Sequence, residues 1–579
     1  MQSDRDRERP IARSMSINKN LIQTMIHRTQ GLLLLLTAVI SGIVTYILND
    51  VGSSFPLSDG GSHYVTGLLA YDWLHTWEFG NPLQYGTEYF KHFPYIGILL
   101  WPPLFYGLEL VAFSLFGPSV DVALMLCTAI AVAGGVVLGR AALKSRQSRL
   151  VAHCMVIAIL TSVLIQDLQR NVLVDGLVSV LSLAAIFQFA YFIVTPSWRG
   201  AAITGLLTIL AFYAKGNGMQ LGLAFPILAV LLRRPRMLID RRTLVMGIGC
   251  ILITGPWLYL TAGLSAQGFL HTLTLKDALD LIGAHLHNVL TAAPVLIPFA
   301  ILGAWKTVSS FIASKDLLEP RMVFDAACLS IVIACLLFHT LIPAAGEARY
   351  VLTAVFGCVG LAASGLEMLI GWFRKAPVGQ AQVGKAANMS LLVAAVFAIQ
   401  AVVSLTQPLP GYPTGVENVA QQVMKSLPDT NRSVLLSGDF NMETSVGPVL
   451  AGLDGARRAT RDGIVLVRGS RAFAGGAYRN RDYIAKFAND AAYLEELQRL
   501  AIPVIVTSTP RPNEQWEHVA AIERVLAMKE SNFVKVAAVS FTPTQQISVW
   551  RRKGEIKPID FDVISESNSF RQRINSVVK

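Results

Sequence analysis

The chain has 579 residues, of which 53% are hydrophobic and only 15% are charged, and its mean hydropathy is +0.49. These values are typical of a polytopic membrane protein and exclude an ordinary soluble enzyme or a disordered chain. The formal net charge is +11, but the basic residues stand in short clusters between apolar runs, as in loops that orient a membrane protein. Nucleic acid is therefore not expected as a partner.

Charge is concentrated near the C-terminus. Residues 411–579 hold 22 lysines and arginines and 18 acidic residues, which is nearly half of the charged residues in under a third of the chain. All six cysteines lie before this region, in apolar runs, so no disulfide framework is expected. We predict a disordered tail at 1–20, a membrane domain at 21–408 and a soluble domain at 409–579.

Apolar runs long enough to cross a bilayer predict a mainly α-helical membrane domain with about eleven transmembrane helices. The predicted spans are 31–49, 119–139, 150–166, 172–194, 200–213, 218–232, 244–262, 288–305, 323–342, 350–373 and 388–406. The apolar run 95–116 begins with Trp-Pro-Pro and ends with Phe-Gly-Pro, and we interpret it as a short interfacial helix. With this interpretation, the arginine-rich segments all fall on one side of the membrane.

The positive-inside rule then places the N-terminus in the cytoplasm and the C-terminal domain outside. The first outer loop is long, from 50 to 118. Because the outer domain carries no cysteine, we expect the inner (plasma) membrane of a bacterium, with the domain in the periplasm.

This outer loop contains candidate functional residues. Asp59 suits a general base, because an ionised carboxylate accepts the proton of a hydroxyl group; the alternative is that it only caps the following helix. His63 follows four residues later, on the same helical face, and with Tyr64 is a candidate to orient neighbours. Lys91 either binds a phosphate or only reaches to the interface, with His92 beside it.

Further ionisable residues fall at the outer ends of later spans. Asp175 opens an apolar helix and should face protein or a water-filled cavity, because facing lipid is costly. Lys215 interrupts two apolar runs next to glycines, which indicates either a cavity-lining break or a simple polar turn. Glu347, Arg349 and Tyr350 open another span, where an arginine opposes the helix dipole and should be held by an anion such as Glu347, Asp175 or a phosphate.

In order and sidedness these features resemble the GT-C superfamily of membrane glycosyltransferases, in particular the branch of protein O-mannosyltransferases and lipid A aminoarabinose transferases. The resemblance covers residues 20–405. Its matching features are Asp59, the Lys91–Pro94 element, the Pro102-Pro103-Leu104 entry to an amphipathic helix, the Asp175 helix, the Lys215-Gly216 break and Arg349-Tyr350. Two departures stand out: many relatives have Asp-Glu where this chain has Asp59-Gly60, and His92 and Phe93 separate Lys91 from Pro94.

The resemblance implies a hexosyl- or pentosyltransferase that moves a sugar from a polyprenyl-phosphate donor to an acceptor hydroxyl at the outer face, with inversion. Asp59 would be the base, and Lys91, with Lys215 and Arg349 as weaker candidates, would hold the donor phosphate. The acceptor could be a glycan, a lipid or a protein, and membrane lipid surrounds the enzyme. No metal ligands are identified and no cofactor is implied with certainty, although a requirement for a divalent metal is left open.

The C-terminal domain alternates β-rich runs with helical stretches, which predicts a small α/β domain. Its role is left open between acceptor binding and a structural cap. Two other functions are also left open. One is a lipid or polysaccharide transporter, or a ligase that uses lipid-linked glycans, although matching repeated halves are absent. The other is a non-catalytic membrane scaffold.

Overall fold

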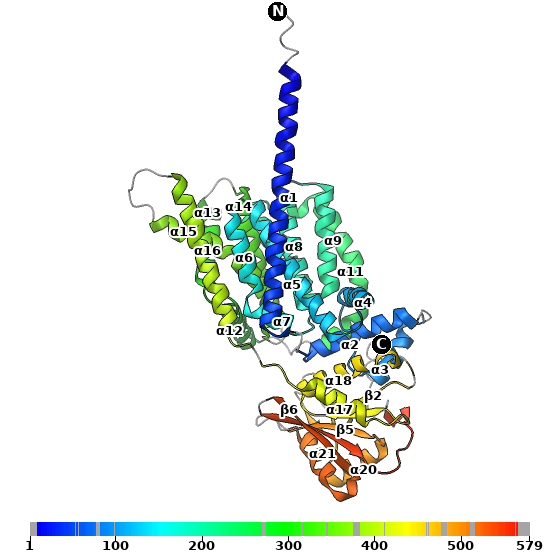
Figure 1. The fold of residues 1–579 in the computed structure, drawn as a ribbon. Helices are drawn as coiled ribbons and strands as arrows, with labels where there is room; N and C mark the ends of the chain where they lie inside the picture. Colours follow the sequence, from blue (N-terminus) through cyan, green and yellow to red (C-terminus); the bar gives the residue numbers. More distant parts are fainter. Residues whose placement is uncertain are drawn as a thin grey trace, which may run out of the picture.

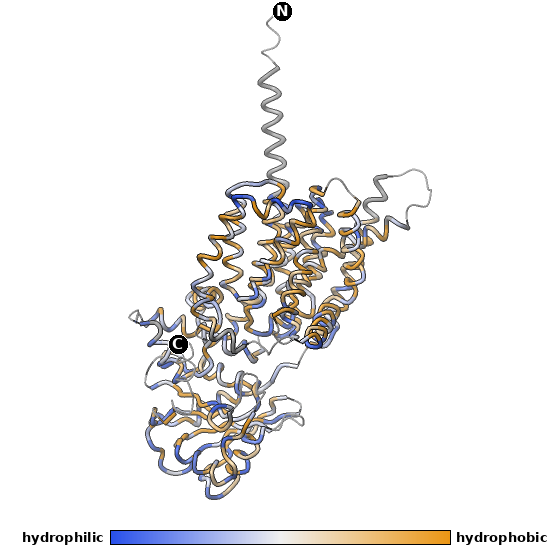
Figure 2. The backbone as a smooth tube through the Cα atoms, turned by 180° about the vertical axis from the view of Figure 1, so that it is seen from behind, coloured by the Kyte–Doolittle hydropathy of each residue, from blue (hydrophilic) through white to orange (hydrophobic). Residues whose placement is uncertain are grey.

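A computed structural model describes the chain from residue 8 to residue 564. Residues 52–53, 56, 77–80, 98, 269–273, 314–316, 343–345, 374–381, 410, 459, 461, 476–482, 510–515, 543 and 562 are not described. The described residues form a bundle of apolar helices with a soluble domain at one end (Figure 1). Figure 2 shows the bundle as largely hydrophobic, with hydrophilic loops at the end remote from the soluble domain.

The bundle is built from helices α1 and α5 to α16. Their bounds are α1 (Glu8–Leu48), α5 (Val120–Lys144), α6 (Arg149–Leu160), α7 (Val163–Gln169), α8 (Asp175–Val194), α9 (Trp198–Ala214), α10 (Leu221–Leu231), α11 (Arg241–Gly268), α12 (Leu275–Ala292), α13 (Ile297–Ala313), α14 (Pro320–Leu341), α15 (Leu352–Phe373) and α16 (Gln382–Thr406). Three 3-10 helices connect them, namely η2 (Gly216–Gln220), η3 (Pro235–Ile239) and η4 (Ala348–Val351).

The predicted polytopic α-helical membrane protein is confirmed. Among the described residues, seven helices are long and apolar enough to cross a membrane, or up to nine if each of two bent pairs is one span. Helix α9 and the stretch Gly216–Leu231 are shorter apolar helices at two further predicted spans. Seven to nine spans are fewer than the predicted number of about eleven, and the two shorter helices lie at the two remaining predicted spans.

Two details of the sequence prediction need correction. The predicted span 288–305 is broken: α12 ends at Ala292, α13 begins at Ile297, and their axes differ by 113°. Pro294 lies in this break, where a proline cannot continue a helix. The tail predicted to be disordered is helical from Glu8 onward, and Pro10 falls in the first turn, where its missing N–H is tolerated; residues 1–7 of that tail lie outside the described part.

The segment 50–118, which the sequence predicts as the first outer loop, contains three helices, α2 (Asp59–Thr76), α3 (Pro82–His92) and α4 (Leu104–Phe116). Helix α4 has 13 residues, so it is about 20 Å long and too short to cross a hydrocarbon core of about 30 Å. Gly117 ends α4 with a positive φ of 91°, which glycine adopts without strain. The apolar run 95–116 therefore contains a short helix, as predicted, and this helix lies next to α2 and α5.

The soluble domain has the predicted α/β character. A five-stranded sheet has the order β2-β1-β5-β7-β6, in which β1 pairs in parallel with β2 and β5 while β7 is antiparallel to β5 and β6. The strands are β1 (Ser433–Ser437), β2 (Val465–Arg468), β5 (Val504–Ser508), β6 (Phe533–Thr542) and β7 (Gln545–Arg552), with a small pair β3 (Ala474–Gly475) and β4 (Ile484–Ala485). The helices are α17 (Val416–Ser426), α18 (Phe440–Leu453), α19 (Gly469–Ala472), α20 (Asp490–Leu500) and α21 (Glu517–Ala527), with short 3-10 turns η5 (Gly455–Arg457) and η7 (Lys529–Ser531).

Helices cover both faces of the sheet. Successive residues of a strand point to opposite faces, so Val434 and Leu436 pack in the core shared with α17 and α18, whereas Leu435 packs with α20 and α21. The first of these cores continues without interruption into α2, α3 and α4. Helices α17 and α18 thus lie between the sheet and the first outer loop (Figure 1), which fixes the soluble domain to the membrane domain.

Candidate functional site

Two ion pairs meet at the end of the bundle that faces the soluble domain. In the first, Arg349 Nη2 lies 2.6 Å from Asp59 Oδ2 and 2.6 Å from Glu347 Oε2. Arg349 comes from η4, just before α15, and Asp59 is the first residue of α2. The arginine that opposes the dipole preference is therefore held by two carboxylates, one of them 290 residues away in sequence.

The second ion pair joins α8 to the break between α9 and η2. Lys215 Nζ lies 2.7 Å from Asp175 Oδ1, and the Asp175 side chain is only 2% exposed. Lys215 has extended backbone angles and ends α9, so its side chain is free to turn toward α8. A carboxylate buried this deeply needs such a partner, because an unpaired buried charge is strongly destabilising.

Tyr350 connects the two ion pairs. The centroid of its ring lies 5.0 Å from Lys215 Nζ and 5.4 Å from the Arg349 guanidinium carbon, both within reach of a cation–π interaction. The ring of His339 stacks on Tyr350 with a centroid distance of 5.1 Å and an interplanar angle of 14°. We call the set Asp59, Asp175, Lys215, Glu347, Arg349 and Tyr350 the site cluster.

Asp59 is ionised in this setting. Burial opposes its charge, but the charge of the Arg349 guanidinium and its hydrogen bond to the carboxylate outweigh burial and hold the pKa of Asp59 below its usual value of 3.8. Its place in the first turn of α2 adds the positive end of the helix dipole. The side chain keeps 21% exposure, so a substrate hydroxyl can still reach the carboxylate.

His63 lies beside the site cluster, one turn along α2 from Asp59. Burial lowers its pKa to about 3, so the imidazole is neutral at physiological pH. Its Nδ1 is 2.8 Å from the Tyr106 hydroxyl oxygen, and its ring lies 4.3 Å from that of Trp101. A neutral, hydrogen-bonded histidine in this position can orient α2 against α4 without competing with Arg349 for Asp59.

Three of the predicted site residues lie apart from the cluster. Lys91 Nζ is 2.8 Å from Glu88 one turn earlier in α3, and none of its described contacts reaches Asp59 or Arg349. His92 Nδ1 is 3.1 Å from the carbonyl oxygen of Ile464 in the soluble domain. Tyr64 is buried against Phe113 of α4, at the domain interface.

The structure adds residues that sequence reasoning did not single out. Asn171, just before α8, hydrogen-bonds both the N–H and the C=O of Leu57, two residues before Asp59. Thr444 of the soluble domain accepts the N–H of Ser58. His339 covers one face of Tyr350. Asn171 lies four residues before Asp175, and this nearness in sequence is the one signal that could have pointed to it.

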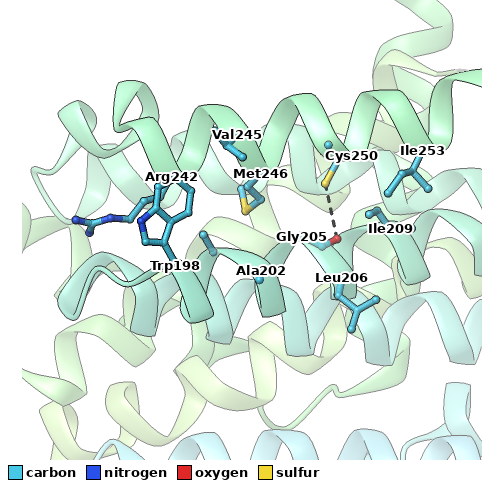
Figure 3. Close-up of a pocket in the computed structure, with 12 residues that line it drawn as sticks. Trp198, Ala202, Gly205, Leu206, Ile209, Arg242, Val245, Met246, Cys250 and Ile253 are labelled. Carbon is cyan, nitrogen blue, oxygen red and sulfur yellow. Dashed lines mark hydrogen bonds between the residues drawn. The ribbon is translucent and has the colours of Figure 1, made fainter.

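A separate cavity of about 310 Å³ lies between α9 and α11 (Figure 3). Trp198 and Arg242 stand at one end of it, and Cys250 lies 3.7 Å from the carbonyl oxygen of Gly205 further along. None of the twelve described residues that line this cavity is acidic. It therefore lacks a base, and the site cluster remains the candidate for hydroxyl chemistry. Nor do the described residues include a group of three His, Cys, Asp or Glu placed to hold a metal ion.

Comparison with solved structures identifies the fold. ArnT from Cupriavidus metallidurans bound to undecaprenyl phosphate aligns with a TM-score of 0.55 at 12% identity, over 91% of this chain and 99% of that one. Its apo state aligns with a TM-score of 0.53 at 12% identity, over 90% and 97%. No protein-family model and no curated protein sequence matches the chain. The protein therefore shares the fold of ArnT, a polytopic helical domain with a C-terminal domain, and this is the architecture that the sequence resemblance implied.

Proposed function

We propose that the protein is a membrane glycosyltransferase that moves a sugar from a polyprenyl-phosphate-linked donor to an acceptor hydroxyl at the outer face, with inversion. The fold it shares with ArnT supports this class, and the ArnT crystal structure contains undecaprenyl phosphate. The site cluster supports the chemistry, because it combines the accessible, ionised carboxylate of Asp59 with two cations, Arg349 and Lys215. That combination is what transfer from a lipid-phosphate sugar requires.

The phosphate of such a donor is already a leaving group. The enzyme has to place an acceptor hydroxyl on the opposite side of the anomeric carbon, remove its proton and stabilise the departing phosphate. Attack from the side opposite the phosphate inverts the anomeric centre. We assign proton removal to Asp59 and stabilisation of the phosphate to Arg349 and Lys215.

The two cations are occupied by carboxylates when no donor is bound. Of the three carboxylates in the site cluster, Glu347 is the most exposed, with 37% of its side chain accessible. A donor phosphate can therefore take its place on Arg349 at little desolvation cost. Asp175 is nearly fully buried and stays with Lys215, which keeps that ammonium next to the Tyr350 ring.

This assignment leaves Lys91 in a smaller role than the sequence resemblance implies. Its partner Glu88 is 59% exposed, and an exposed ion pair one turn apart on a helix contributes little. Lys91 would act from the surface of α3, where a lysine can attract an anionic lipid without holding the phosphate during transfer.

The observation that carries the proposal is the Asp59–Arg349 pair beside Lys215–Asp175. Its test is sugar transfer by the full-length protein in proteoliposomes, with labelled polyprenyl-phosphate sugars from a bacterial lipid extract as donor. We expect Asp59→Asn to lower transfer by on the order of 1000-fold, because the amide cannot accept the proton.

Asp121→Asn is the matched control, since Asp121 also stands in the first turn of a helix, α5, but outside the site cluster. It should transfer sugar at the wild-type rate. Transfer by Asp59→Asn within a few-fold of wild type, at equal protein level, would refute the assigned base.

A further inference from the structure

We propose that the soluble domain takes part in catalysis by positioning Asp59, through a clamp on residues 57–61 formed by Thr444 of α18 and Asn171 of the membrane domain. The inference rests on the proposed function of Asp59 as the base. It assigns to the C-terminal domain a role in the reaction itself, beyond the roles of acceptor binding or a structural cap. Thr444 and Asn171 are positioning residues, because neither touches the reacting atoms.

Thr444 holds the residue immediately before Asp59. The backbone N–H of Ser58 donates to Thr444 Oγ1 at 3.0 Å, and the same hydroxyl donates to the carbonyl oxygen of Phe440 at 2.6 Å. The hydroxyl proton is thus directed into α18, which leaves a lone pair for Ser58. Ser58 has a φ of 55°, in the left-handed region that a non-glycine residue adopts only when its surroundings impose it.

Asn171 holds the same segment from the membrane side. Its side chain accepts from the N–H of Leu57 at 3.1 Å and donates to the carbonyl oxygen of Leu57 at 3.3 Å. Leu57 is therefore bonded through both backbone groups to one amide. Together with Thr444, this fixes the backbone just before α2, so the direction in which the Asp59 side chain leaves α2 is also fixed.

The two glycines after Asp59 make the clamp close. A Cβ atom on Gly60 would lie 1.8 Å from Asn171 Oδ1, and one on Gly61 would lie 2.1 Å from the carbonyl oxygen of Thr444. Only glycine allows both approaches. The absence of a second acid after Asp59, a departure from many GT-C relatives, therefore has a physical reason in this chain: Asn171 occupies the space that a side chain at residue 60 would need.

Other contacts hold α18 against the outer loop. Arg458, just after α18, pairs with both carboxylate oxygens of Asp72 in α2 at 2.8 and 3.0 Å and also donates to the carbonyl oxygens of Ala451 and Gly452. The Tyr89 hydroxyl donates to the same aspartate at 3.0 Å. These bonds are buried and lie well away from Asp59. They hold the soluble domain against α2, whereas Thr444 bonds the backbone next to Asp59.

The experiment compares Thr444→Val with Thr444→Ser in the full chain. Valine keeps the shape of threonine but cannot accept from Ser58, whereas serine can. We expect Thr444→Val to lower kcat for sugar transfer about tenfold with an unchanged KM for the donor, since a small misplacement of the base affects the reacting geometry and not donor binding. Thr444→Ser should restore kcat.

Hydrogen exchange gives a readout that needs no substrate. In Thr444→Val the amide of Ser58 should exchange at least about tenfold faster than in wild type, with the second half of α2 unchanged. Asn171→Ala should produce the same pattern at the amide of Leu57. Ser445→Ala is the matched control, because the Ser445 hydroxyl donates to Asn441 within α18 and not to the membrane domain.

Wild-type kcat and wild-type exchange at Ser58 in Thr444→Val would overturn the clamp, as would an equal loss of kcat in Ser445→Ala. Failure of the proposed function looks different. If Asp59→Asn still transferred sugar, the base would be misassigned, while faster exchange at Ser58 in Thr444→Val would still establish the contact.

Discussion

The bundle buries charged side chains at both of its ends, and the two groups differ in how they are built. At the end remote from the soluble domain, Asp325 of α14 is fully buried, accepts from the Ser364 hydroxyl of α15 at 2.7 Å and lies 3.9 Å from Lys306 of α13. Arg321 and Glu367 form an ion pair nearby. We call these five residues the far-end cluster.

The site cluster instead gathers residues at helix starts and breaks. Asp59 and Asp175 are first residues of helices, Lys215 stands at an interruption, and Arg349 lies in a 3-10 turn. The two carboxylates that pair with Arg349, Asp59 and Glu347, remain partly exposed. The comparison teaches that burial of a charge alone does not mark a site: the far-end cluster ties three regular helices together, whereas the site cluster leaves groups that a substrate can contact.

Among the changes that compare the two clusters, the largest effect is expected from removing Arg349. Arg349→Gln takes away the proposed phosphate ligand and also the partner of Asp59, so transfer should fall on the order of 100-fold or more. Arg321→Gln breaks an ion pair of the far-end cluster and should transfer at nearly the wild-type rate. Equal losses in the two variants, measured in proteoliposomes at matched protein levels, would remove the distinction between the clusters.

The far-end cluster should respond in stability instead of activity. Asp325→Ala removes the carboxylate that joins α13, α14 and α15, and should lower the free energy of unfolding by roughly 2–3 kcal/mol, because Lys306 and Ser364 lose their partner. Asp325→Asn keeps an acceptor for Ser364 and should cost less. Thermal unfolding in detergent measures both variants, and a loss of transfer in folded Asp325→Ala would contradict a purely structural role.

Lys215 and Lys91 allow a comparison at the end of the bundle that faces the soluble domain. Lys215→Gln should raise the KM for the donor about tenfold, since its ammonium is held next to Tyr350 and Asp175. Lys91→Gln should change the KM by no more than about twofold, because Lys91 is exposed and paired with Glu88. Titration of the donor measures both KM values. A larger increase in Lys91→Gln than in Lys215→Gln would restore Lys91 as the phosphate ligand.

The smallest predicted effect is a shift of the pH profile. The pKa of Asp59 is lowered from its usual value of 3.8, so the carboxylate stays ionised as the pH falls through the neutral range, and transfer should lose its base only under more acidic conditions than an ordinary aspartate would. In Arg349→Gln, Asp59 stays buried but loses the positive charge beside it, which raises its pKa. The acid limb of the pH profile of kcat/KM should therefore move up by about one pH unit or more. An unmoved acid limb would mean that Asp59 is not the titrating base.

Much of this architecture was predictable from the sequence, because hydropathy and positive charge are local signals. The apolar runs predicted the bundle, and the Trp-Pro-Pro and Phe-Gly-Pro boundaries predicted the short helix α4. The alternation of β-rich runs with helical stretches predicted the α/β character of the soluble domain. The break at Pro294 was missed because the residues on both sides of it are apolar, so hydropathy runs through it.

Pairing between distant residues was not predictable in the same way. The orientation of Arg349 against the helix dipole indicated an anionic partner, and Glu347 was among those considered, but Asp59 lies 290 residues away. Lys91 was favoured by its neighbours in sequence, although Glu88 one turn away already binds it. Nothing near Thr444 in the sequence indicates that its hydroxyl meets Ser58.

The most direct test of the account is the identity of the lipid that copurifies with the full-length protein. Mass spectrometry of the wild-type and Asp59→Asn proteins should detect a sugar linked to a polyprenyl phosphate, and the double variant Lys215→Gln, Arg349→Gln should lose it. Absence of any polyprenyl-phosphate lipid from the wild type, or its full retention by the double variant, would contradict the proposed phosphate site.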